Sequence, residues 1–437
     1  MTRTADPIDV RARLKRLLPD KHIIDLAAET GAVRRKRRIG IVPLVWALVL
    51  GFGTGRSRTI AGLRRAFEQA TGTDVVASAF YDRFTPALAK LLRELCKELI
   101  DGVCREDVAM HGLLMPFKAL LVADSTVIRL HDKLKRSFKA CRTNHTLAAL
   151  KAHVVMNVLG AGPCSVKITS ERVHDGPMLR AGTWVKDCLL LFDLGYWRFQ
   201  LFACIEQQGG YFITRLKGRA NPTIVAAHRI WRGQSVPIVG QKLQDVLSRL
   251  MRAVLDVEVE LHFRRRAYRG ARRGATYRCR LVALRNVETG EYHVYLTNLP
   301  PETLGAEEVA YTYRARWMVE LTFKQLKQHY RIDELPTTKR RVVEALVHAA
   351  LITIIASRAL HAYVLSRIAA DDRRVPPDRW AAIFAANASV ILAILVRPPR
   401  HSAIDRRYLD ATLRREAPDP NRSRMPLLVP LVDGPAC

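Results

Sequence analysis

The sequence predicts an α/β protein in which a mixed sheet core lies between helical regions at the two ends of the chain. Three observations lead to this class. Residues 1–112 and the residues after 333 carry the apolar spacing of helices. Between Lys118 and Lys217, short apolar runs typical of buried strands alternate with turns. From 219 to 301 the pattern changes to the alternation expected of half-buried strands.

The charge of the chain indicates a polyanionic partner. Lys and Arg number 71 against 41 Asp and Glu, which gives a formal charge of +30. Nucleic acid fits this excess better than a membrane surface, because the longest apolar run near the N-terminus, Ile41 to Phe52, is too short to span a bilayer. The N-terminus, with Asp6 and Asp9, lacks the layout of a signal peptide. We therefore expect a DNA-binding protein that makes no membrane contact.

The cysteines indicate a reducing compartment. The chain has 8 cysteines, and none forms a CxxC pair. This spacing argues against a structural zinc site and favours free thiols. The expected location is the cytoplasm.

The first 112 residues predict a bundle of short helices, at 9–18, 20–29, 43–50, 59–70 and 78–99. A basic run occupies 34–38 and predicts a contact with the DNA backbone, although a solvated linker has the same composition. A helix-turn-helix could form here, but the pattern is common in helical domains. We interpret this region as DNA-binding.

Two acidic residues follow buried strands in the next part of the chain. The run 119–123 ends in Asp124, and the run 188–192 ends in Asp193. Open α/β sheets place their sites at the carboxyl ends of strands, so both acids are candidates for a functional site. Taken singly, each could instead be a helix cap or a turn residue. Further elements are expected as strands at 153–159, 164–173 and 211–217 and a helix at 197–208.

A β-rich stretch follows, with strands expected at 254–265, 276–285 and 292–298. The loop 264–273 holds six arginines together with Tyr268. Such a loop suits phosphate contacts, and its alternative is a solvated hairpin tip.

The segment from Tyr313 to Lys327 contains no Gly or Pro and predicts a helix. At about 100° per residue, Tyr313, Arg316, Glu320 and Lys327 fall within roughly 60° of one another. Most other positions are apolar, so we expect a buried helix that presents one polar stripe to a cleft. The alternative is a surface helix with an ordinary Arg316–Glu320 ion pair.

The C-terminal part predicts apolar helices at 344–368 and 380–396. From Arg397 the chain is rich in Pro and Arg and has little core-forming pattern, which indicates a basic, partly disordered tail.

Asp124, Asp193 and Glu320 together form a set suited to phosphodiester chemistry. Cleavage of a phosphodiester requires charge neutralisation and an activated nucleophile, and two divalent ions about 3.5–4 Å apart supply both. Mg²⁺ prefers hard oxygen ligands. We expect Asp124 to bridge two Mg²⁺ ions, with Asp193 and Glu320 each holding one, and Mn²⁺ to be able to substitute.

The spacing of Tyr313, Arg316, Glu320 and Lys327, with Trp317 after the arginine, resembles the Y-R-E-K signature of DDE transposases from bacterial insertion sequences, of the group-four type. Two further segments resemble this family. They are 78–84 (SAFYDRF) and 193–197 (DLGYW), the latter similar to D-x-G-Y-F with Trp197 in place of Phe. The resemblance covers roughly residues 78–333.

The resemblance implies a ribonuclease-H-like mixed sheet core interrupted by a β-rich insertion. The corresponding regions are a helical DNA-binding region (1–112), the first part of the core (113–218), the insertion (219–301), the rest of the core with C-terminal helices (302–396) and the tail (397–437). It implies that Asp124, Asp193 and Glu320 are the catalytic metal ligands. It also implies DNA contacts by a second group of residues, Tyr313, Arg316, Trp317, Lys327, Arg215 and Lys217.

The implied function is a DNA transposase that binds the inverted-repeat ends of an insertion sequence, pairs them as a homodimer, cleaves the strands and joins them to target DNA. The implied location is the bacterial cytoplasm, in association with the nucleoid. Two alternatives remain open at this point. One is a ribonuclease-H-like, structure-specific DNA endonuclease, and the other is a non-catalytic DNA-binding protein derived from a transposase. Where relatives cut through a DNA hairpin, an aromatic residue of the insertion holds a flipped base, and Tyr292, His293 and Tyr295 are candidates for that role.

Overall fold

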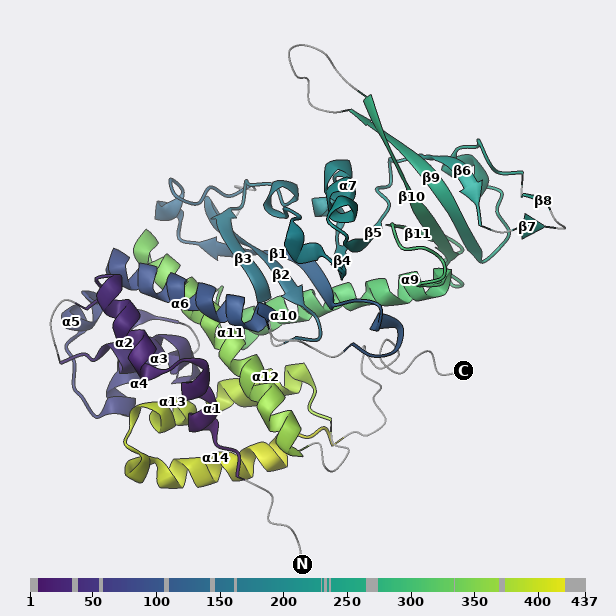
Figure 1. Cartoon of the computed structure of the whole chain (residues 1–437). Helices are drawn as coiled ribbons and strands as arrows, with labels where there is room; N and C mark the ends of the chain where they lie inside the picture. The colour runs from purple at the N-terminus through teal and green to yellow at the C-terminus, as the bar shows by residue number, and fades with distance from the viewer. Residues whose placement is uncertain are drawn as a thin grey trace, which may run out of the picture.

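The computed structural model describes residues 7–33, 38–54, 58–105, 110–141, 146–160, 163–228, 230–231, 234–235, 237–264, 274–333, 335–368 and 374–420. The chain forms a mixed α/β fold with one large sheet and a helical lobe beneath it (Figure 1). The α/β class predicted from the sequence is therefore confirmed. The basic run at 34–38 lies outside the described residues except for Arg38, as does all but the first residue of the arginine-rich loop 264–273.

The large sheet has nine strands in the order β3-β2-β1-β4-β5-β11-β10-β9-β6. Its strands are β1 (Ala119–Leu130), β2 (Ala148–Asn157), β3 (Pro163–Ser170), β4 (Cys188–Phe192), β5 (Tyr211–Arg215), β6 (Thr223–Ala227), β9 (Val254–Arg264), β10 (Gly274–Arg285) and β11 (Tyr292–Thr297). A separate pair is formed by β7 (Ile230–Trp231) and β8 (Gln234–Ser235). Strand β1 runs parallel to β4, and β4 runs parallel to β5, whereas the other pairings of the large sheet are antiparallel.

The parallel strands are apolar because both faces of the sheet are covered. All five residues of β4 are buried, and successive side chains pack alternately into two hydrophobic cores. Leu189 and Leu191 face the core shared with the helical lobe, while Leu190 and Phe192 face a second core that includes Phe202 of α7 (Phe199–Gln207). The sequence boundaries of β4 were predicted correctly because an uninterrupted apolar run marks a strand buried on both faces.

The β-rich stretch does not form a separate sheet. Strand β11 pairs with β5 through Tyr295↔Arg215, Leu296↔Thr214 and Thr297↔Ile213, so β11, β10, β9 and β6 extend the same sheet outward. Figure 1 shows β9 and β10 as a long hairpin that projects from the end of the molecule. Within it, Arg280 is 4% exposed and forms a two-pronged ion pair with Asp256, at 2.8 Å and 2.6 Å.

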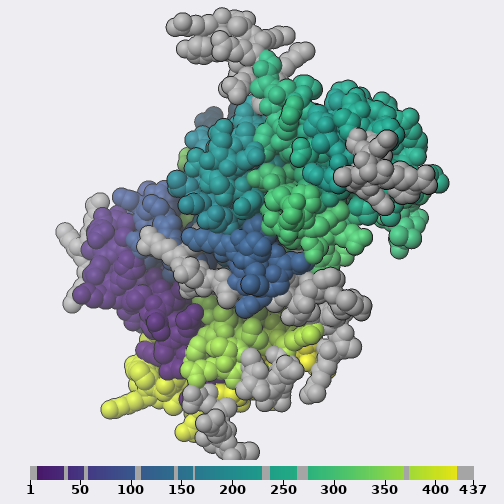
Figure 2. All heavy atoms as spheres, turned by 45° about the vertical axis from the view of Figure 1, so that its right-hand side comes forward, coloured from purple at the N-terminus to yellow at the C-terminus, as the bar shows by residue number. Residues whose placement is uncertain are grey.

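The helical lobe combines both ends of the chain. Its N-terminal helices are α1 (Val10–Leu17), α2 (Asp20–Glu29), α3 (Ile41–Leu50), α4 (Ile60–Thr71), α5 (Ala77–Tyr81) and α6 (Pro86–Arg105). Its C-terminal helices are α11 (Arg340–Ile368), α12 (Pro377–Ala386), α13 (Ala388–Val396) and α14 (Ala403–Glu416). Figure 2 shows the purple N-terminal and yellow C-terminal surfaces side by side, and the backbone NH of Ile8 donates to Asp410 Oδ1 at 2.8 Å. The remaining helices are α8 (Leu243–Leu247), α9 (Ala306–Tyr313) and α10 (Trp317–Gln328).

A buried arginine joins the two ends of the chain. Arg58 is 0% exposed, and its guanidinium donates to the carbonyls of Leu48 and Tyr330, each at 2.7 Å, and to Thr353 Oγ1 at 2.8 Å. It also lies over the ring of Phe52, 4.7 Å from its centroid. Leu48 belongs to the last turn of α3, where the helix dipole favours a cation. Arg58 thus binds α3, the end of α10 and α11 together.

Helix α11 is the longest apolar helix among the described residues. It is long and apolar enough to cross a membrane, and the bent pair of α12 and α13 also passes that test together. In this fold, however, 83% of the apolar window of α11 is buried, packed against helices that include α6, α3 and α1. Its hydrophobicity is accounted for by the core of the helical lobe.

Several predicted boundaries were wrong. Strand β1 does not end before Asp124 but continues to Leu130, because 125–130 pair with β2 along their whole length. The predicted helix 78–99 is two helices separated by residues 82–85, and the predicted helix 380–396 bends by 60° between α12 and α13. The predicted tail is also structured over much of its length, since α14 buries Leu409 and Leu413 against the helical lobe. Residues 421–437 lie outside the described part.

Candidate active site

Three neighbouring parallel strands bring polar residues to one level of the sheet. Ala123 of β1 pairs with Phe192 of β4, and Phe192 pairs with Thr214 of β5. One residue further along the chain, Asp124 follows Ala123, Asp193 follows Phe192, and Arg215 follows Thr214. Neighbouring strands lie roughly 4.8 Å apart. The two aspartates follow directly from paired residues, so both side chains point to the same face of the sheet as Val122 and Leu191, toward the helical lobe.

Glu320 reaches this level from α10, which packs against β1. A single guanidinium connects it to the sheet. Arg316 Nη1 donates to Asp124 Oδ2 at 3.1 Å, and Arg316 Nη2 donates to Glu320 Oε1 at 2.5 Å. The pairing of Arg316 with Glu320 within one turn is the expected i,i+4 contact, but the bond to Asp124 spans 192 residues of sequence.

The pKa of Asp124 is affected by both of the other carboxylates. Burial raises the pKa of Asp124 most, and the negative charges of Asp193 and Glu320 raise it further. The backbone NH of Ser125 and the charge of Arg316 lower it, and the net pKa is about 6. A nearby cation would therefore stabilise the ionised form of the Asp124 carboxyl group.

The predicted helix 313–327 is interrupted. Helix α9 ends at Tyr313, a short 3₁₀ turn covers Arg314–Arg316, and α10 begins at Trp317. The single polar stripe expected from an unbroken helix is therefore not formed as predicted. The break turns the two aromatic residues in different directions.

Tyr313 is buried, and Trp317 is exposed. The Tyr313 ring is 8% exposed and packs edge-on against Tyr295 at 5.3 Å, and its hydroxyl lies 3.4 Å from the carbonyl oxygen of Phe192. Burial raises the pKa of its phenol. Trp317, by contrast, is 51% exposed beside the acidic cluster. A base could stack on Trp317 but not on Tyr313 in this arrangement.

The remaining predicted DNA contacts lie in two places, at the end of β5 and at the end of α10. Arg215 and Lys217 are exposed at and beyond the end of β5, and Arg215 Nη2 lies 3.4 Å from His293 Nδ1. Lys327 lies at the far end of α10 from Trp317, and its surroundings include Asp333 and Arg129. Burial lowers the pKa of Lys327. Lys327 is therefore not a neighbour of Arg316 and the two acids that Arg316 contacts.

The three carboxylates fit a divalent metal in chemical type, because they supply only hard oxygen ligands and their mutual repulsion raises the pKa of Asp124. Among the described residues, however, no group of three or more His, Cys, Asp or Glu side chains is already arranged around a metal position. The guanidinium of Arg316 forms ion pairs with both Asp124 and Glu320, so it competes with a cation for these two carboxylates.

A second polar cluster lies behind Asp124 and was missed in the sequence. It includes Ser125, Lys151, His153 and Asp175. The signal that could have revealed it is the presence of Lys151 and His153 at alternate positions of the otherwise buried strand β2, which places two polar side chains on one inner face.

Comparison with known families decides the class of this site. A family described as the transposase DDE domain matches residues 115–356, which include Asp124, Asp193 and Glu320. The chain belongs to this family. It is a DNA transposase, an enzyme of metal-dependent DNA strand cleavage and transfer.

Individual relatives of this transposase are distant but span most of the chain. The transposase for insertion sequence element IS231F of Bacillus thuringiensis subsp. israelensis is 23% identical over 383 residues, covering 78% of this chain and 77% of the relative. The transposase for IS231D of Bacillus thuringiensis subsp. finitimus is 21% identical over 369 residues, covering 75% and 74%. The solved piggyBac transposase synaptic complex with hairpin DNA has a TM-score of 0.49 and 11% identity, covering 97% of this chain and 88% of that chain.

Proposed function

We propose that Asp124, Asp193 and Glu320 are the catalytic carboxylates of this transposase. The observation that carries the proposal is the register of β1 and β4, which places both aspartates side by side, together with the arginine that links Asp124 to Glu320. The family match spans all three residues. No other described set of acids combines this sheet position with a partner from a distant helix.

The cofactor we propose is a pair of Mg²⁺ ions, for which Mn²⁺ can substitute. Asp124, Asp193 and Glu320 would hold these ions, and the charges of Asp193 and Glu320 already raise the pKa of Asp124 beyond the effect of its burial. When bound, such ions activate the attacking oxygen and stabilise the leaving oxygen of the phosphodiester. The protein holds the carboxylates in place from two strands and one helix.

We further propose that the exposed residues around this centre hold the DNA. Arg215 and Lys217 suit phosphate contacts at the end of β5. Trp317 suits stacking on a base or sugar. Lys327 suits a phosphate further along α10, and Arg316 becomes available for a phosphate once it leaves the acids. Tyr313, the last residue of α9, acts through packing, since its ring is buried against Tyr295 of the sheet.

The core is proposed to be ribonuclease-H-like. Support comes from the strand order β3-β2-β1-β4-β5, with three antiparallel strands followed by two parallel ones, and from the acids at β1 and after β4. The spacing of Tyr313, Arg316, Glu320 and Lys327 supports membership of the group-four insertion sequences with the Y-R-E-K signature. Residues 219–301, which contain the strands from β6 to β11, are the proposed insertion.

On this basis the substrates are the inverted-repeat ends of an insertion sequence and a target duplex. A homodimer would pair the two ends in a synaptic complex, in the bacterial cytoplasm and in association with the nucleoid. The charge of +30 supports a long DNA contact surface.

The test uses the full-length protein and a DNA fragment that carries one end of the element. Asp124→Asn, Asp193→Asn and Glu320→Gln should each retain end binding and lose strand cleavage by more than about 1,000-fold. Retained cleavage in any one variant would reject that residue. A structure-specific endonuclease is the alternative, and pre-cut ends distinguish it, because only a transposase joins their 3′-hydroxyls to a second duplex.

A further inference from the structure

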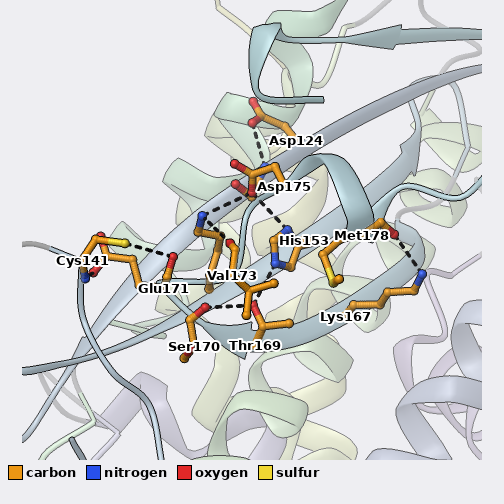
Figure 3. Close-up of polar contacts among 12 residues, drawn as sticks. Asp124, Cys141, His153, Lys167, Thr169, Ser170, Glu171, Val173, Asp175 and Met178 are labelled. Atoms are coloured by element: carbon orange, nitrogen blue, oxygen red, sulfur yellow. Dashed lines mark hydrogen bonds and ion pairs between the residues drawn. The ribbon is translucent and has the colours of Figure 1, made fainter. Parts of the chain in front are cut away.

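The polar cluster behind Asp124 is centred on Asp175. Asp175 Oδ1 lies 3.4 Å from Lys151 Nζ and 3.1 Å from His153 Nδ1, although the histidine contact is not aligned as a linear hydrogen bond. The other ring nitrogen of His153, Nε2, is 2.9 Å from Thr169 Oγ1. Figure 3 shows His153 pointing toward Asp175, with Asp124 just beyond. Two side chains of β2 thus meet at a single carboxylate, and His153 connects it to Thr169 of β3.

The cluster lies on the face of the sheet opposite to Glu320. Ser125 pairs directly with His153, and Asp124 pairs with Val154, so neighbouring residues of β1 point to opposite faces. Asp124 faces α10, whereas Ser125 lies on the same face as its pairing partner His153 and close enough to Asp175 to lower the pKa of that carboxyl group. Asp175 therefore supports the strand that carries Asp124 from behind.

The same carboxylate also contacts the loop that carries Asp193. A Cβ atom placed on Gly195 would lie only 3.2 Å from Asp175 Oδ2, so this loop runs directly against the carboxylate. Next to this contact, Arg198 Nη1 donates to the carbonyl of Gly176 at 3.1 Å. The segment around Asp175 is thus fixed to the loop just after Asp193 through Gly195 and Arg198.

The charge of Asp175 is stabilised by its neighbours. Burial alone would raise its pKa, but the nearby polar groups of His153 and Ser125 and the charge of Lys151 outweigh this and lower the pKa to about 2. His153 is 5% exposed and Tyr196, on the loop after Asp193, is 2% exposed. The hydroxyl of Tyr196 has no hydrogen-bond partner among the described residues, so the contacts of Asp175 with Lys151 and His153 are the ones that hold the carboxylate.

We propose that Asp175 is a positioning residue of the transposase reaction, which sets the spacing of Asp124 and Asp193 by holding Ser125 on one strand and the Gly195 loop on the next. The proposal rests on the catalytic role proposed for those two aspartates. Metal-binding side chains must be held to within about 0.5 Å, and supporting residues behind them typically change metal affinity by about 10–100-fold when replaced. Asp175 itself touches neither DNA nor the reacting atoms.

The experiment compares Asp175→Asn with Asp245→Asn, which removes the same charge at an exposed position on α8. Mn²⁺ affinity is measured by electron paramagnetic resonance on the DNA-free protein, and cleavage of a DNA end is measured against Mg²⁺ concentration. Asp175→Asn should weaken Mn²⁺ binding by about 10–100-fold and raise the Mg²⁺ concentration for half-maximal cleavage by a similar factor. End binding should stay within about twofold, and Asp245→Asn should behave as the wild type.

Unchanged Mn²⁺ affinity in a folded Asp175→Asn protein overturns the proposal. The proposal is also overturned if cleavage and DNA-end binding are lost together and excess Mg²⁺ does not restore cleavage, because such a loss indicates general structural damage. If Asp175→Asn does not fold, Ser125→Ala is used instead, because it removes only the hydroxyl that lies between Asp124 and Asp175. It should then shift both metal readouts by about 3–10-fold, and no shift overturns the proposal. Asp124→Asn, measured alongside, separates failure of this proposal from failure of the proposed active site. If Asp124→Asn cleaves normally, the proposed active site itself is wrong.

Discussion

Arg316 forms two ion pairs with acids that are proposed to bind metal, and this predicts that its removal tightens metal binding. The change is Arg316→Gln. The Arg316, Asp124 and Glu320 side chains are 17%, 19% and 33% exposed, so their ion pairs are partly screened by water. We take each of the two charge-assisted hydrogen bonds to be worth about 1 kcal/mol net. Their sum, about 2 kcal/mol, corresponds to about 30-fold in affinity.

The assay is a Mn²⁺ titration of the DNA-free protein at pH 8, followed by electron paramagnetic resonance. At this pH the wild-type Asp124, with a pKa of about 6, is ionised and accepts the ion. The variant should bind Mn²⁺ about 30 times more tightly. The gain should shrink at pH 6, because loss of the guanidinium raises the pKa of Asp124 further and a proton then competes with the ion.

The matched control is Arg314→Gln. Arg314 lies in the same short turn and carries the same charge, but its guanidinium lies over the ring of Tyr311, 5.6 Å from the centroid, and its side chain is exposed. Any general effect of one lost positive charge should appear in both variants. If Arg316→Gln binds Mn²⁺ no more tightly than Arg314→Gln, the guanidinium does not compete for the carboxylates and the reasoning fails.

Three further predictions concern other parts of the molecule. Arg58→Ala should lower the free energy of unfolding by about 3–5 kcal/mol in urea denaturation, because it leaves buried carbonyls without a donor, and a loss below about 1 kcal/mol would contradict this. Asp175 has a folded pKa of about 2 against an ordinary 3.8, so its ionised form stabilises the fold above pH 4 and this contribution fades as the pH falls toward 2. The difference in unfolding free energy between wild type and Asp175→Asn should thus be about 2 kcal/mol at pH 7 and should narrow on acidification below pH 4, whereas a constant difference would exclude the charge as its cause. Trp317→Ala should weaken binding of a DNA end by about 1–3 kcal/mol in a fluorescence titration while Trp317→Phe retains most of it, and equal losses in both variants would rule out stacking.

The predictions from sequence succeeded where one physical signal dominated. The run Cys188–Phe192 is apolar throughout because both of its faces are buried, so its boundaries and the acid that follows it were readable. Strand β1 was cut short because Ser125 and Thr126 are polar. Ser125 is tolerated inside the sheet because it faces Asp175, which lies 50 residues away in sequence.

The site was readable in its residue types but not in its detailed geometry. Asp124, Asp193 and Glu320 were predicted from strand ends and spacing. The strand register places Asp124 beside Asp193, and Arg316 links Asp124 to Glu320. The 3₁₀ turn at Arg314–Arg316 could not be predicted, since no Gly or Pro marks it. The bond between Arg316 and Asp124 depends on a contact across 192 residues, which no local pattern encodes.

The attachment of β11 to β5 constrains how this enzyme can change over evolution or in the laboratory. Because three residue pairs join the projecting hairpin's sheet to the strand that ends in Arg215, the projection cannot swing as an independent arm without breaking main-chain bonds beside the acids. Removing these strands would leave β5 as an exposed edge strand that could pair with other protein chains. Any replacement module must therefore bring its own bordering strand.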